Sequence, residues 1–387
     1  MRLSCTVDDA AAVAARVRAS VPSPADVGAE VAAIVADVRE RGDAAVREYE
    51  QRFGGGEMAA EDLDPAVRAG LQTAIANVRA VAEAGLDAES TATLPEGQTV
   101  RLREVPVRRA AVYAPGGRNP YPSSVIMGAV TARAAGVEKV VVAAPAHPLI
   151  AAAAELCGVD AVYPMGGAQA IAALAYGTET IPRVDVIVGP GSPWVQEAKR
   201  QVSGVVGIDG FAGPSDLTVI ASGDADPAPL RLDLLAQAEH GEGSLTVALS
   251  DDATLLDALP GTTVLAADMD AALAFAEALA PEHLQLAGAA AEALAPRVRS
   301  AGCLFVGIES GTAFGDYVAG SNHTLPTDGA ARFASGLSTR HFRRRMAEVR
   351  VGAAAPALAR AGAPVARAEG FEHHAASMEI RENPTSG

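Results

Sequence analysis

Cysteine, aromatic residues and long apolar runs are all scarce in this chain of 387 residues. Its three cysteines, Cys5, Cys157 and Cys303, are far apart and form no CxxC pair, so we interpret each as a small buried residue in a reducing cytosol. Aromatic residues make up only 4% of the chain, so its cores must be built from Ala, Val and Leu. No segment approaches the roughly 18 uninterrupted apolar residues of a membrane span.

Positive charge is also in short supply. The chain has 31 Lys and Arg residues against 47 Asp and Glu residues, a formal net charge of −16. This balance argues against nucleic acid or an anionic membrane as a partner, because either would be repelled. The first residues lead into Asp8 and Asp9 without the apolar run of a signal peptide. We therefore expect a cytoplasmic enzyme that acts on small molecules.

Strand-like and helix-like segments alternate through most of the sequence. Between residues 24 and 87, apolar residues such as Val31, Ile34 and Val38 follow the 3.6-residue period of helices. Further on, the predicted strands are 100–105, 110–113, 140–144, 161–163, 184–188, 217–221, 245–249, 263–265 and 303–306. The predicted helices between and after them lie near 123–135, 148–157, 168–176, 193–202, 229–240, 270–279 and 339–381. Such alternation predicts mostly parallel sheets with helices on both faces.

A chain of this length predicts at least two domains. We predict an α/β protein with two Rossmann-like domains, mostly parallel sheets, and helical N- and C-terminal extensions. The first domain is expected to comprise residues 1–112 with 217–337, the helical N-terminal part included. Residues 113–216 are expected to form the second α/β domain, which binds a cofactor. Residues 338–387 are expected to form a helical tail domain, in which Arg343–Arg345 is a solvated helix face.

Glycine-containing turns stand where several predicted strands end. They are Tyr113–Gly117, Gly166–Ala170, Gly189–Ser192 and Ala212–Ser215. None matches the GxGxxG fingerprint or a P-loop, and each alone is explained as a tight turn that needs glycine. Ligands gather at the carboxyl ends of strands in open α/β sheets, so four such turns favour a dinucleotide crevice.

Histidines cluster beside carboxylates in the second half of the chain. Five of the seven lie in four short segments: 233–240, 281–283, 315–323 and 369–374. Gln237 and His240 are three residues apart on a predicted helix, so both heads can converge on one point. Such a pair alone would more often be a hydrogen-bonded helix face. With Asp316 and a late histidine it gives the nitrogen and oxygen ligands that zinc takes, although the pattern does not choose between His373 and His374.

Glu282 and His283 follow a proline and place a carboxylate beside an imidazole. One interpretation is a pair of general bases on one rigid turn. The alternative is the first turn of a helix, with an acid near the positive end of the helix dipole. The other histidine clusters favour the first interpretation.

These segments together resemble the histidinol dehydrogenase family, zinc- and NAD-dependent enzymes of histidine biosynthesis. The resemblance runs nearly from end to end. Its matching segments are Arg41–Tyr49, Tyr113–Gly117, Tyr121–Val125, Gly166–Glu179, Val188–Gly191, Ala212–Ser215, Gln237–His240, Pro281–Leu284, Gly315–Tyr317, Asn322–Thr327 and Glu369–His374.

The resemblance assigns roles to individual residues. It implies the zinc ligands Gln237, His240, Asp316 and His374, of which the last is chosen over His373 by its distance from Glu369. It implies Glu282 and His283 as the catalytic pair. It implies NAD contacts at Tyr113, Gln169 and Ser192. The implied substrate contacts are Ser123, Ser215, His323 and Glu369, together with the zinc ligands and His283.

The resemblance also implies a reaction and an assembly. Histidinol would lose two hydrides in succession to NAD through a bound aldehyde, with His283 taking the hydroxyl proton and Glu282 activating water. The family is a homodimer in which the tail of one subunit completes the other's site, so Glu369 and His374 would act in trans.

The sequence departs from the family pattern at three places, of which Asn119 bears on the choice between rival substrates. Ser192 stands where the family has an asparagine at the cofactor, Asn119 stands where a small residue is common near the substrate, and the segment 251–260 is short. Asn119 favours a related zinc and NAD dehydrogenase of another diol, such as sulfopropanediol, whereas Glu369 suits the ammonium group of histidinol. A zinc hydrolase using Glu282 would leave the glycine turns unexplained, and a non-catalytic binding protein would not need both bases.

Overall fold

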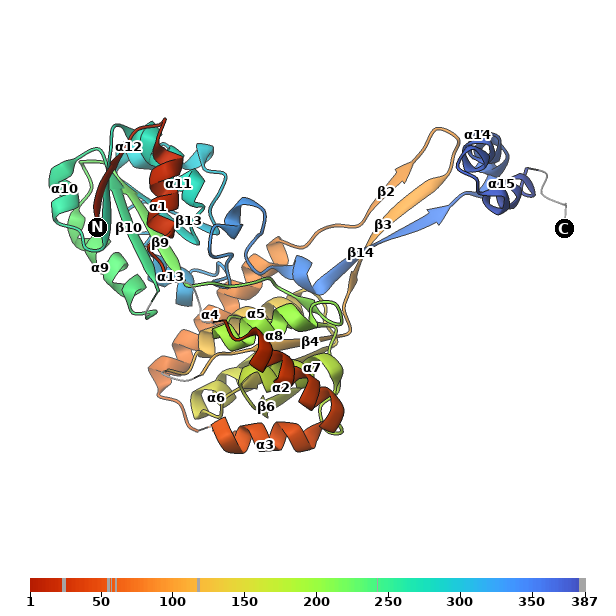
Figure 1. Ribbon diagram of the computed structural model, residues 1–387, viewed down its shortest axis with the longest axis horizontal. Helices are drawn as coiled ribbons and strands as arrows, with labels where there is room; N and C mark the ends of the chain where they lie inside the picture. Colours follow the sequence, from red (N-terminus) through yellow and green to blue (C-terminus); the bar gives the residue numbers. More distant parts are fainter. Residues whose placement is uncertain are drawn as a thin grey trace. The chain divides into compact units, whose positions relative to one another are not determined.

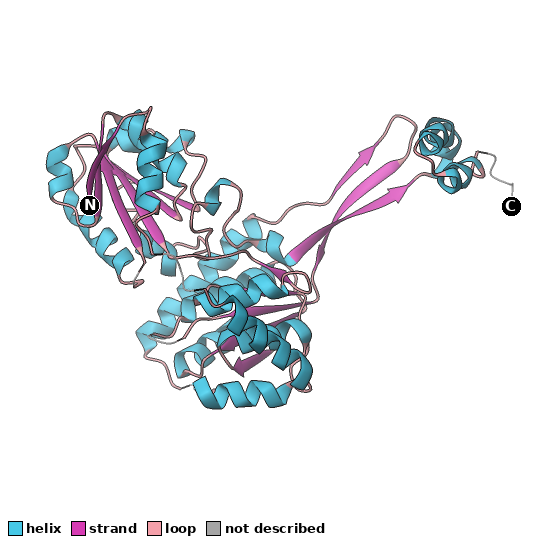
Figure 2. Cartoon of the chain, in the orientation of Figure 1, coloured by secondary structure: helices cyan, strands magenta, loops and turns pink. Residues whose placement is uncertain are grey.

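The computed structural model describes residues 1–22, 26–53, 56, 58, 59, 61–116, 119–241 and 243–382. Residues 24 and 25 of the predicted helical region, and Gly117 of the predicted Tyr113–Gly117 turn, lie outside these ranges. Within them the strands form a six-stranded, a five-stranded and a three-stranded sheet (Figures 1 and 2).

The six-stranded sheet is parallel throughout, in the order β1-β11-β10-β9-β12-β13. Its strands are β1 (Arg2–Cys5), β9 (Asp216–Ala221), β10 (Leu245–Ser250), β11 (Thr262–Ala266), β12 (His283–Ala287) and β13 (Cys303–Val306). Every residue of β9 and β12 is buried. Strands of a parallel sheet that is covered on both faces are expected to read as near-continuous apolar runs, and β9 does so apart from Asp216 and Thr218.

Helices cover both faces of this sheet. They are α1 (Ala10–Arg18), α9 (Pro227–Ala238), α10 (Ala253–Asp257), α11 (Met269–Leu279), α12 (Ala289–Glu292) and α13 (Thr312–Tyr317). Helices α1 and α11 lie side by side (Figure 1). The Asp226 carboxylate caps the first turn of α9 by accepting from the Ala228 N–H, and the proline after Asp226 suits the first helical position. The short α10 occupies the shortened segment 251–260.

The five-stranded sheet is also parallel, in the order β6-β5-β4-β7-β8. Its strands are β4 (Arg109–Tyr113), β5 (Lys139–Ala144), β6 (Ala161–Pro164), β7 (Val186–Val188) and β8 (Gly207–Ile208). The helices that pack with it are α2 (Gly28–Arg41), α3 (Asp43–Phe53), α4 (Pro65–Ala84), α5 (Pro122–Ala134), α6 (Pro148–Cys157), α7 (Gly167–Tyr176) and α8 (Pro193–Val202).

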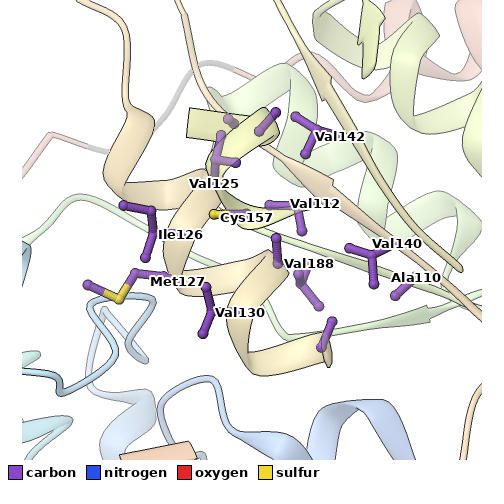
Figure 3. Packing of buried hydrophobic residues seen from close by; sticks show 14 of the residues in the cluster. Ala110, Val112, Val125, Ile126, Met127, Val130, Val140, Val142, Cys157 and Val188 are labelled. Carbon is purple, nitrogen blue, oxygen red and sulfur yellow. The ribbon is translucent and has the colours of Figure 1, made fainter. Parts of the chain in front are cut away.

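Helix α5 packs closely on the middle of this sheet. Val125 and Met127 of α5 belong to the same buried cluster as Val112 of β4 and Val142 of β5 (Figure 3). A Cβ at Gly128 would lie 2.6 Å from the Val112 side chain, so this glycine permits the close approach of helix and strand. Short Ala and Val side chains thus make up most of this dense core, and Phe342 is an aromatic residue buried in it.

The predicted boundary at residue 112 differs from this arrangement. Strand β4 pairs with β5 and β7, so residues 109–112 belong to the five-stranded sheet. Helices α2 and α3 contact α7, and α4 contacts α5, because their apolar stripes share the cores of this sheet. The position of these three helices in the chain suggested that they belong to the first predicted domain. A helix packs where its apolar face is buried, however, and here that is against the five-stranded sheet and its helices.

A second compact unit consists of Leu86–Pro106 with the chain from Arg343 onward. It contains β2 (Ser90–Thr93), β3 (Thr99–Pro106), β14 (Arg343–Arg350), α14 (Ala355–Ala368) and α15 (Glu372–Glu379). Its antiparallel sheet has the order β14-β3-β2. The prediction of a helical domain over 338–387 was therefore wrong for residues 343–350, where pairing with β3 overrides the local sequence preference. The arginine run lies on a strand, because residues 343, 344 and 345 pair with Pro106, Val105 and Glu104 of β3.

Four short 3₁₀ turns complete the described elements: Ala295–Arg297, Ala330–Arg332, Thr339–Phe342 and Gly352–Ala354. The predicted α/β fold class with two mostly parallel sheets is confirmed. None of the described helices is both long and apolar enough to cross a membrane.

Candidate active site

Gln237 and His240 lie together at the end of α9, as predicted, although the helix ends at Ala238 and His240 follows it. The buried Gln237 amide donates to the Ser215 hydroxyl at 2.8 Å and to the Ser244 hydroxyl at 3.1 Å. Both amide protons are therefore used, and its Oε1 is the atom suited to a cation. His240 Nδ1 lies 3.1 Å from the Gln237 carbonyl, which leaves Nε2 for the same purpose.

Glu282 and His283 stand at the start of β12, so the helix-turn interpretation was wrong. Burial raises the pKa of Glu282 to about 8; the hydrogen bond with Ser215 opposes this shift, and the charge of Asp216 adds to it. Glu282 Oε2 accepts from the Asp216 N–H at 3.1 Å. His283 Nδ1 lies 3.1 Å from the Asp216 carbonyl, and its ring contacts Phe305 with 6.0 Å between centroids. A carboxyl that titrates near neutrality and an imidazole are suited to two separate proton transfers.

His323 and Asp316 lie next to each other, and Asp316 also lies near His283. His323 Nδ1 lies 3.0 Å from the Asp316 carbonyl, and its Nε2 lies 3.3 Å from the Ser124 hydroxyl. The Asp316 carboxylate lies 3.9 Å from His283 Nε2. Burial lowers the pKa of His323, the Asp316 charge opposes this, and the charges of His283 and His240 add to the lowering. These mutual effects bring together three of the four predicted histidine segments, 233–240, 281–283 and 315–323.

Three histidines share one hydrogen-bonding pattern. In His240, His283 and His323, Nδ1 faces a backbone carbonyl, and a carbonyl oxygen can only accept a hydrogen bond. Each neutral ring therefore carries its proton on Nδ1 and presents Nε2 as a base or ligand. Backbone contacts of this kind orient imidazoles at metal and catalytic sites.

The metal ligand set is only partly gathered within one unit of the chain. Among the described residues, no three His, Cys, Asp or Glu side chains are grouped closely enough to hold a metal ion. Of the predicted ligands, Gln237, His240 and Asp316 belong to the unit with both parallel sheets, and helix α13 with Asp316 contacts α9. His374 belongs to the other unit, where it is exposed beside Phe371. Glu369 is exposed at the end of α14 in that same unit.

The predicted cofactor residues Tyr113 and Gln169 are linked through the turn before α7. The Tyr113 hydroxyl accepts from the Gly167 N–H at 3.1 Å, and burial raises its pKa. The Gln169 amide donates to Glu50 Oε1 at 2.9 Å, and the same oxygen accepts from the Gly166 N–H at 3.2 Å. Burial raises the pKa of Glu50, and both hydrogen bonds oppose the shift. Glu50 thus fixes Gln169 and the turn together.

A buried ion pair holds the turn that leads to Ser192. Lys199 of α8 is 1% exposed and forms an ion pair with Asp209. Lys199 donates to the Gly189 carbonyl at 3.0 Å, while Asp209 accepts from the Gly189 N–H at 2.6 Å. At Gly189 φ is 117°, and an added Cβ would lie 2.1 Å from the Tyr113 carbonyl oxygen. Ser192 is exposed at the start of α8, and its side chain forms no cap to that helix.

Several residues of the site were not predicted from the sequence. Ser124, the neighbour of the predicted Ser123, is the serine in contact with His323. Asp216 directly follows the predicted Ser215 and contacts both bases. Glu50 directly follows the matched segment Arg41–Tyr49, which was the only signal near it, whereas Lys199 lies on a helix for which no motif was quoted.

The family model described as histidinol dehydrogenase matches residues 18–262 and 258–382. The chain belongs to the histidinol dehydrogenase family. It is 42% identical to histidinol dehydrogenase of Rhizobium meliloti, with 92% of each chain covered. It is 41% identical to that of Rhodospirillum rubrum, with 98% of this chain and 97% of the other covered. The crystal structure of histidinol dehydrogenase from Elizabethkingia anophelis superposes with a TM-score of 0.88 at 29% identity, over 93% of each chain.

Family membership confirms the resemblance predicted from the motifs, and the chain is an oxidoreductase. The match to the solved histidinol dehydrogenase extends over both parallel sheets and the second unit, since 93% of the chain is covered. The residues described above therefore occupy the fold of that family.

Proposed function

We propose that this chain oxidises L-histidinol to L-histidine by two successive hydride transfers to NAD through a bound histidinaldehyde. The observation that supports this most directly is the Glu282–His283 pair, two proton acceptors of different chemistry held on one strand start. The family relatives are named for the same substrate. Two oxidations separated by a hydration move protons from different groups, the alcohol and the water, and a pair of bases can serve one each.

His283 takes the hydroxyl proton of the alcohol through Nε2, because its Nδ1 is occupied by the Asp216 carbonyl. The hydride leaves the same carbon for NAD, so the alcohol becomes an aldehyde. Glu282, with a pKa of about 8, then accepts a proton from water as the water adds to the aldehyde. The aldehyde oxygen takes the proton held by His283 as the hydrate forms. The second hydride then leaves the hydrate for a second NAD and a hydroxyl proton leaves for solvent, which yields the carboxylic acid that ionises to the carboxylate.

A zinc ion would be held by Gln237 Oε1, His240 Nε2, the Asp316 carboxylate and His374. The donor atoms are of the kind that zinc takes, and the Ser215, Ser244 and backbone contacts leave the amide oxygen and the imidazole Nε2 available to bind it. When bound, zinc supplies a Lewis acid that orients the amino alcohol and stabilises negative charge on its oxygen.

Tyr113, Gln169 and Ser192 are proposed to contact NAD at the carboxyl ends of β4, β6 and β7, where ligands of open α/β sheets bind. Ser123, Ser215, His323 and Glu369 are proposed substrate contacts. An acid at position 369 suits the ammonium group of histidinol. We place the enzyme in the cytoplasm, as a homodimer whose tails complete the sites.

The test is NADH formation with purified, zinc-loaded protein, using histidinol against a panel of diols and other amino alcohols that includes sulfopropanediol. The expected result is a kcat/KM for histidinol that exceeds every other substrate by at least about 10²-fold, since a site that pairs polar substrate groups discriminates strongly. Preference for another diol, or hydrolysis without NADH, would replace the proposal by one of its rivals.

A further inference from the structure

Asp216 begins β9 at the centre of the six-stranded sheet, between β10 and β12. It is 1% exposed. The register pairs Leu217 with His283, so Asp216 lies directly opposite the residue before it, Glu282. A buried carboxylate on a central strand is costly unless it is paired and hydrogen-bonded.

Asp216 contacts both bases through three different atoms. Its carboxylate Oδ1 accepts from the Glu282 N–H at 2.7 Å, and its own N–H donates to Glu282 Oε2 at 3.1 Å. Its carbonyl receives His283 Nδ1 at 3.1 Å. The reciprocal bonds fix the Glu282 backbone and carboxyl together, and the third fixes the His283 ring.

Arg18, the last residue of α1, holds this arrangement from the other side. Its Nη1 donates to Asp216 Oδ2 at 2.8 Å, and its Nη2 donates to the Leu279 carbonyl at 2.7 Å. Leu279 ends α11, and Ala280 follows in the left-handed region with φ of 48°. One guanidinium thus joins the carboxylate of Asp216 to the backbone that enters the catalytic segment.

The Asp216 carboxylate and the Arg18 guanidinium carry opposite charges that suit these contacts. Both Asp216 carboxylate oxygens accept hydrogen bonds, as an ionised carboxylate does. Burial raises the pKa of Asp216, and the Arg18 guanidinium opposes that shift. The planar fork of arginine reaches two acceptors at once, which the single ammonium of lysine does not reproduce.

We propose that Asp216 and Arg18 are positioning residues of the dehydrogenase, which hold the Glu282 carboxyl and the His283 ring at a fixed separation and in one tautomer. The inference rests on the proposed function of these two bases. Neither positioning residue touches substrate, and their effect is on the rate of proton transfer through a displacement of the bases. A misplacement of about 1 Å can cost about 10²-fold in rate.

The variants are Asp216→Asn, Arg18→Gln and Arg18→Lys. The matched control is Arg2→Gln, which removes an ion pair of similar type between the N-terminal segment and α10, Arg2 to Asp257 at 2.5 Å, with both groups exposed. All are compared with wild type for zinc content, melting temperature, and kcat and KM with histidinol and with histidinaldehyde.

The expected result is a kcat about 10²-fold lower in Asp216→Asn and Arg18→Gln for both substrates, with KM within about threefold and zinc content unchanged, since the ligands are untouched. Arg18→Lys should recover part of the loss by restoring the charge, and Arg2→Gln should match wild type. If Arg18→Gln does not fold, Arg18→Lys provides the same comparison.

A second readout does not depend on the substrate. ¹⁵N NMR of the His283 ring, assigned by its loss in His283→Asn, should show one Nδ1–H tautomer in wild type and an averaged pair of shifts in Arg18→Gln. Folded variants with unchanged kcat and an unchanged tautomer would overturn the inference. A wild type that oxidises another alcohol instead would overturn the proposed function, while the ring tautomer would still decide whether Arg18 positions His283.

Discussion

At the scale of single residues, the positions of protons in this site are fixed by the backbone. The imidazoles of His240, His283 and His323 each have Nδ1 committed to a carbonyl, so the chemistry of each ring is assigned to Nε2. The neighbouring Glu282 differs, because its carboxyl is buried and its pKa of about 8 lets it exchange protons near neutrality. Under the proposed function, these two acceptors would serve two different steps.

Glu282→Gln should slow conversion of added histidinaldehyde by about 10²–10⁴-fold, the range of a lost general base, while oxidation of the alcohol to the aldehyde changes far less. The glutamine side chain can still accept the Asp216 N–H, so the fold should be retained. Stopped-flow NADH formation from each substrate separates the two steps. His283→Asn is the control with the reverse pattern, and equal small losses for both variants in both steps would contradict the assignment.

The residues of the candidate site that would carry the chemistry could be proposed from the sequence, whereas the residues that position them could not. Short motifs of polar and ionisable residues contain Gln237, His240, Glu282 and His283. Arg18 is separated from Asp216 by 198 positions, and no local pattern reports a contact over such a distance. Long-range contacts of this kind are set by packing, which one sequence without its fold does not display.

At the scale of elements, most strands of the parallel sheets were predictable because they contain apolar runs, whereas β12, with its His and Gln, and β14 were not predicted. The arginines of β14 follow no strand period, and its eight residues become a strand through pairing with β3. Short strands such as β1 and β8 were missed for a related reason, since four or two residues carry too little pattern. Tertiary pairing decided these elements.

The buried Lys199–Asp209 pair should be a strong local determinant of stability. Lys199→Met leaves the Asp209 carboxylate buried without its cation and should lower the free energy of unfolding by about 3–5 kcal/mol. The loss of the bond to the Gly189 carbonyl should also raise the KM for NAD, because the turn before Ser192 loosens. Urea unfolding and initial rates measure both effects.

The matched control for this change is Lys139→Met, whose partner Asp160 is only partly buried and whose own side chain is 52% exposed. An exposed pair contributes about 0–1 kcal/mol, so this variant should be close to wild type. Equal destabilisation by the two substitutions would show that burial does not set the contribution of Lys199.

Asp160 should make stability depend on acid pH. Burial alone would raise its pKa, but hydrogen bonds from the Val140 N–H, Lys139 and Arg133 lower the pKa to about 2 from the ordinary 3.8. A lowered pKa means that the folded state is stabilised above the ordinary value and loses this contribution as the pH falls toward the lowered one. The contribution is therefore lost between about pH 4 and about pH 2.

Asp160→Asn should accordingly cost about 1–2 kcal/mol at neutral pH, a value that allows for solvent screening of a surface group. The difference between wild type and variant should shrink toward zero as the pH is lowered through that window. Urea unfolding at a series of pH values is the measurement. A difference that stays constant to the lowest pH would assign the effect to packing instead of charge.

At the scale of the whole molecule, the chain divides into the unit with both parallel sheets and the unit that carries Glu369 and His374. The tail residues are exposed within their own unit, which suits groups that serve another site. A metal ligand donated by a partner would couple dimerisation to zinc binding, because whatever binds only the assembled state stabilises it.

Mixing His374→Ala with the double variant Glu282→Gln/His283→Asn, under conditions that exchange subunits, should therefore restore activity to about a quarter of wild type. The value follows from random pairing in a two-fold dimer, in which half of the dimers are mixed and each mixed dimer has one intact site. NADH formation is measured after exchange has been verified with labelled subunits. Proven exchange without activity would show that His374 serves its own chain or binds no metal.

The pairing of β3 with β14 has a consequence during synthesis on the ribosome. The two strands meet across 239 positions of sequence, as the bond between Arg343 and Glu104 shows. At the usual 5–20 residues per second, β3 waits roughly 10–50 s for this partner to be translated. Both parallel sheets are complete in the nascent chain before β14, α14 and α15 emerge. The edge of β3 is thus open to chaperones or to another nascent chain during that interval, and the tail with His374 is translated only after the rest of the candidate site has had time to form.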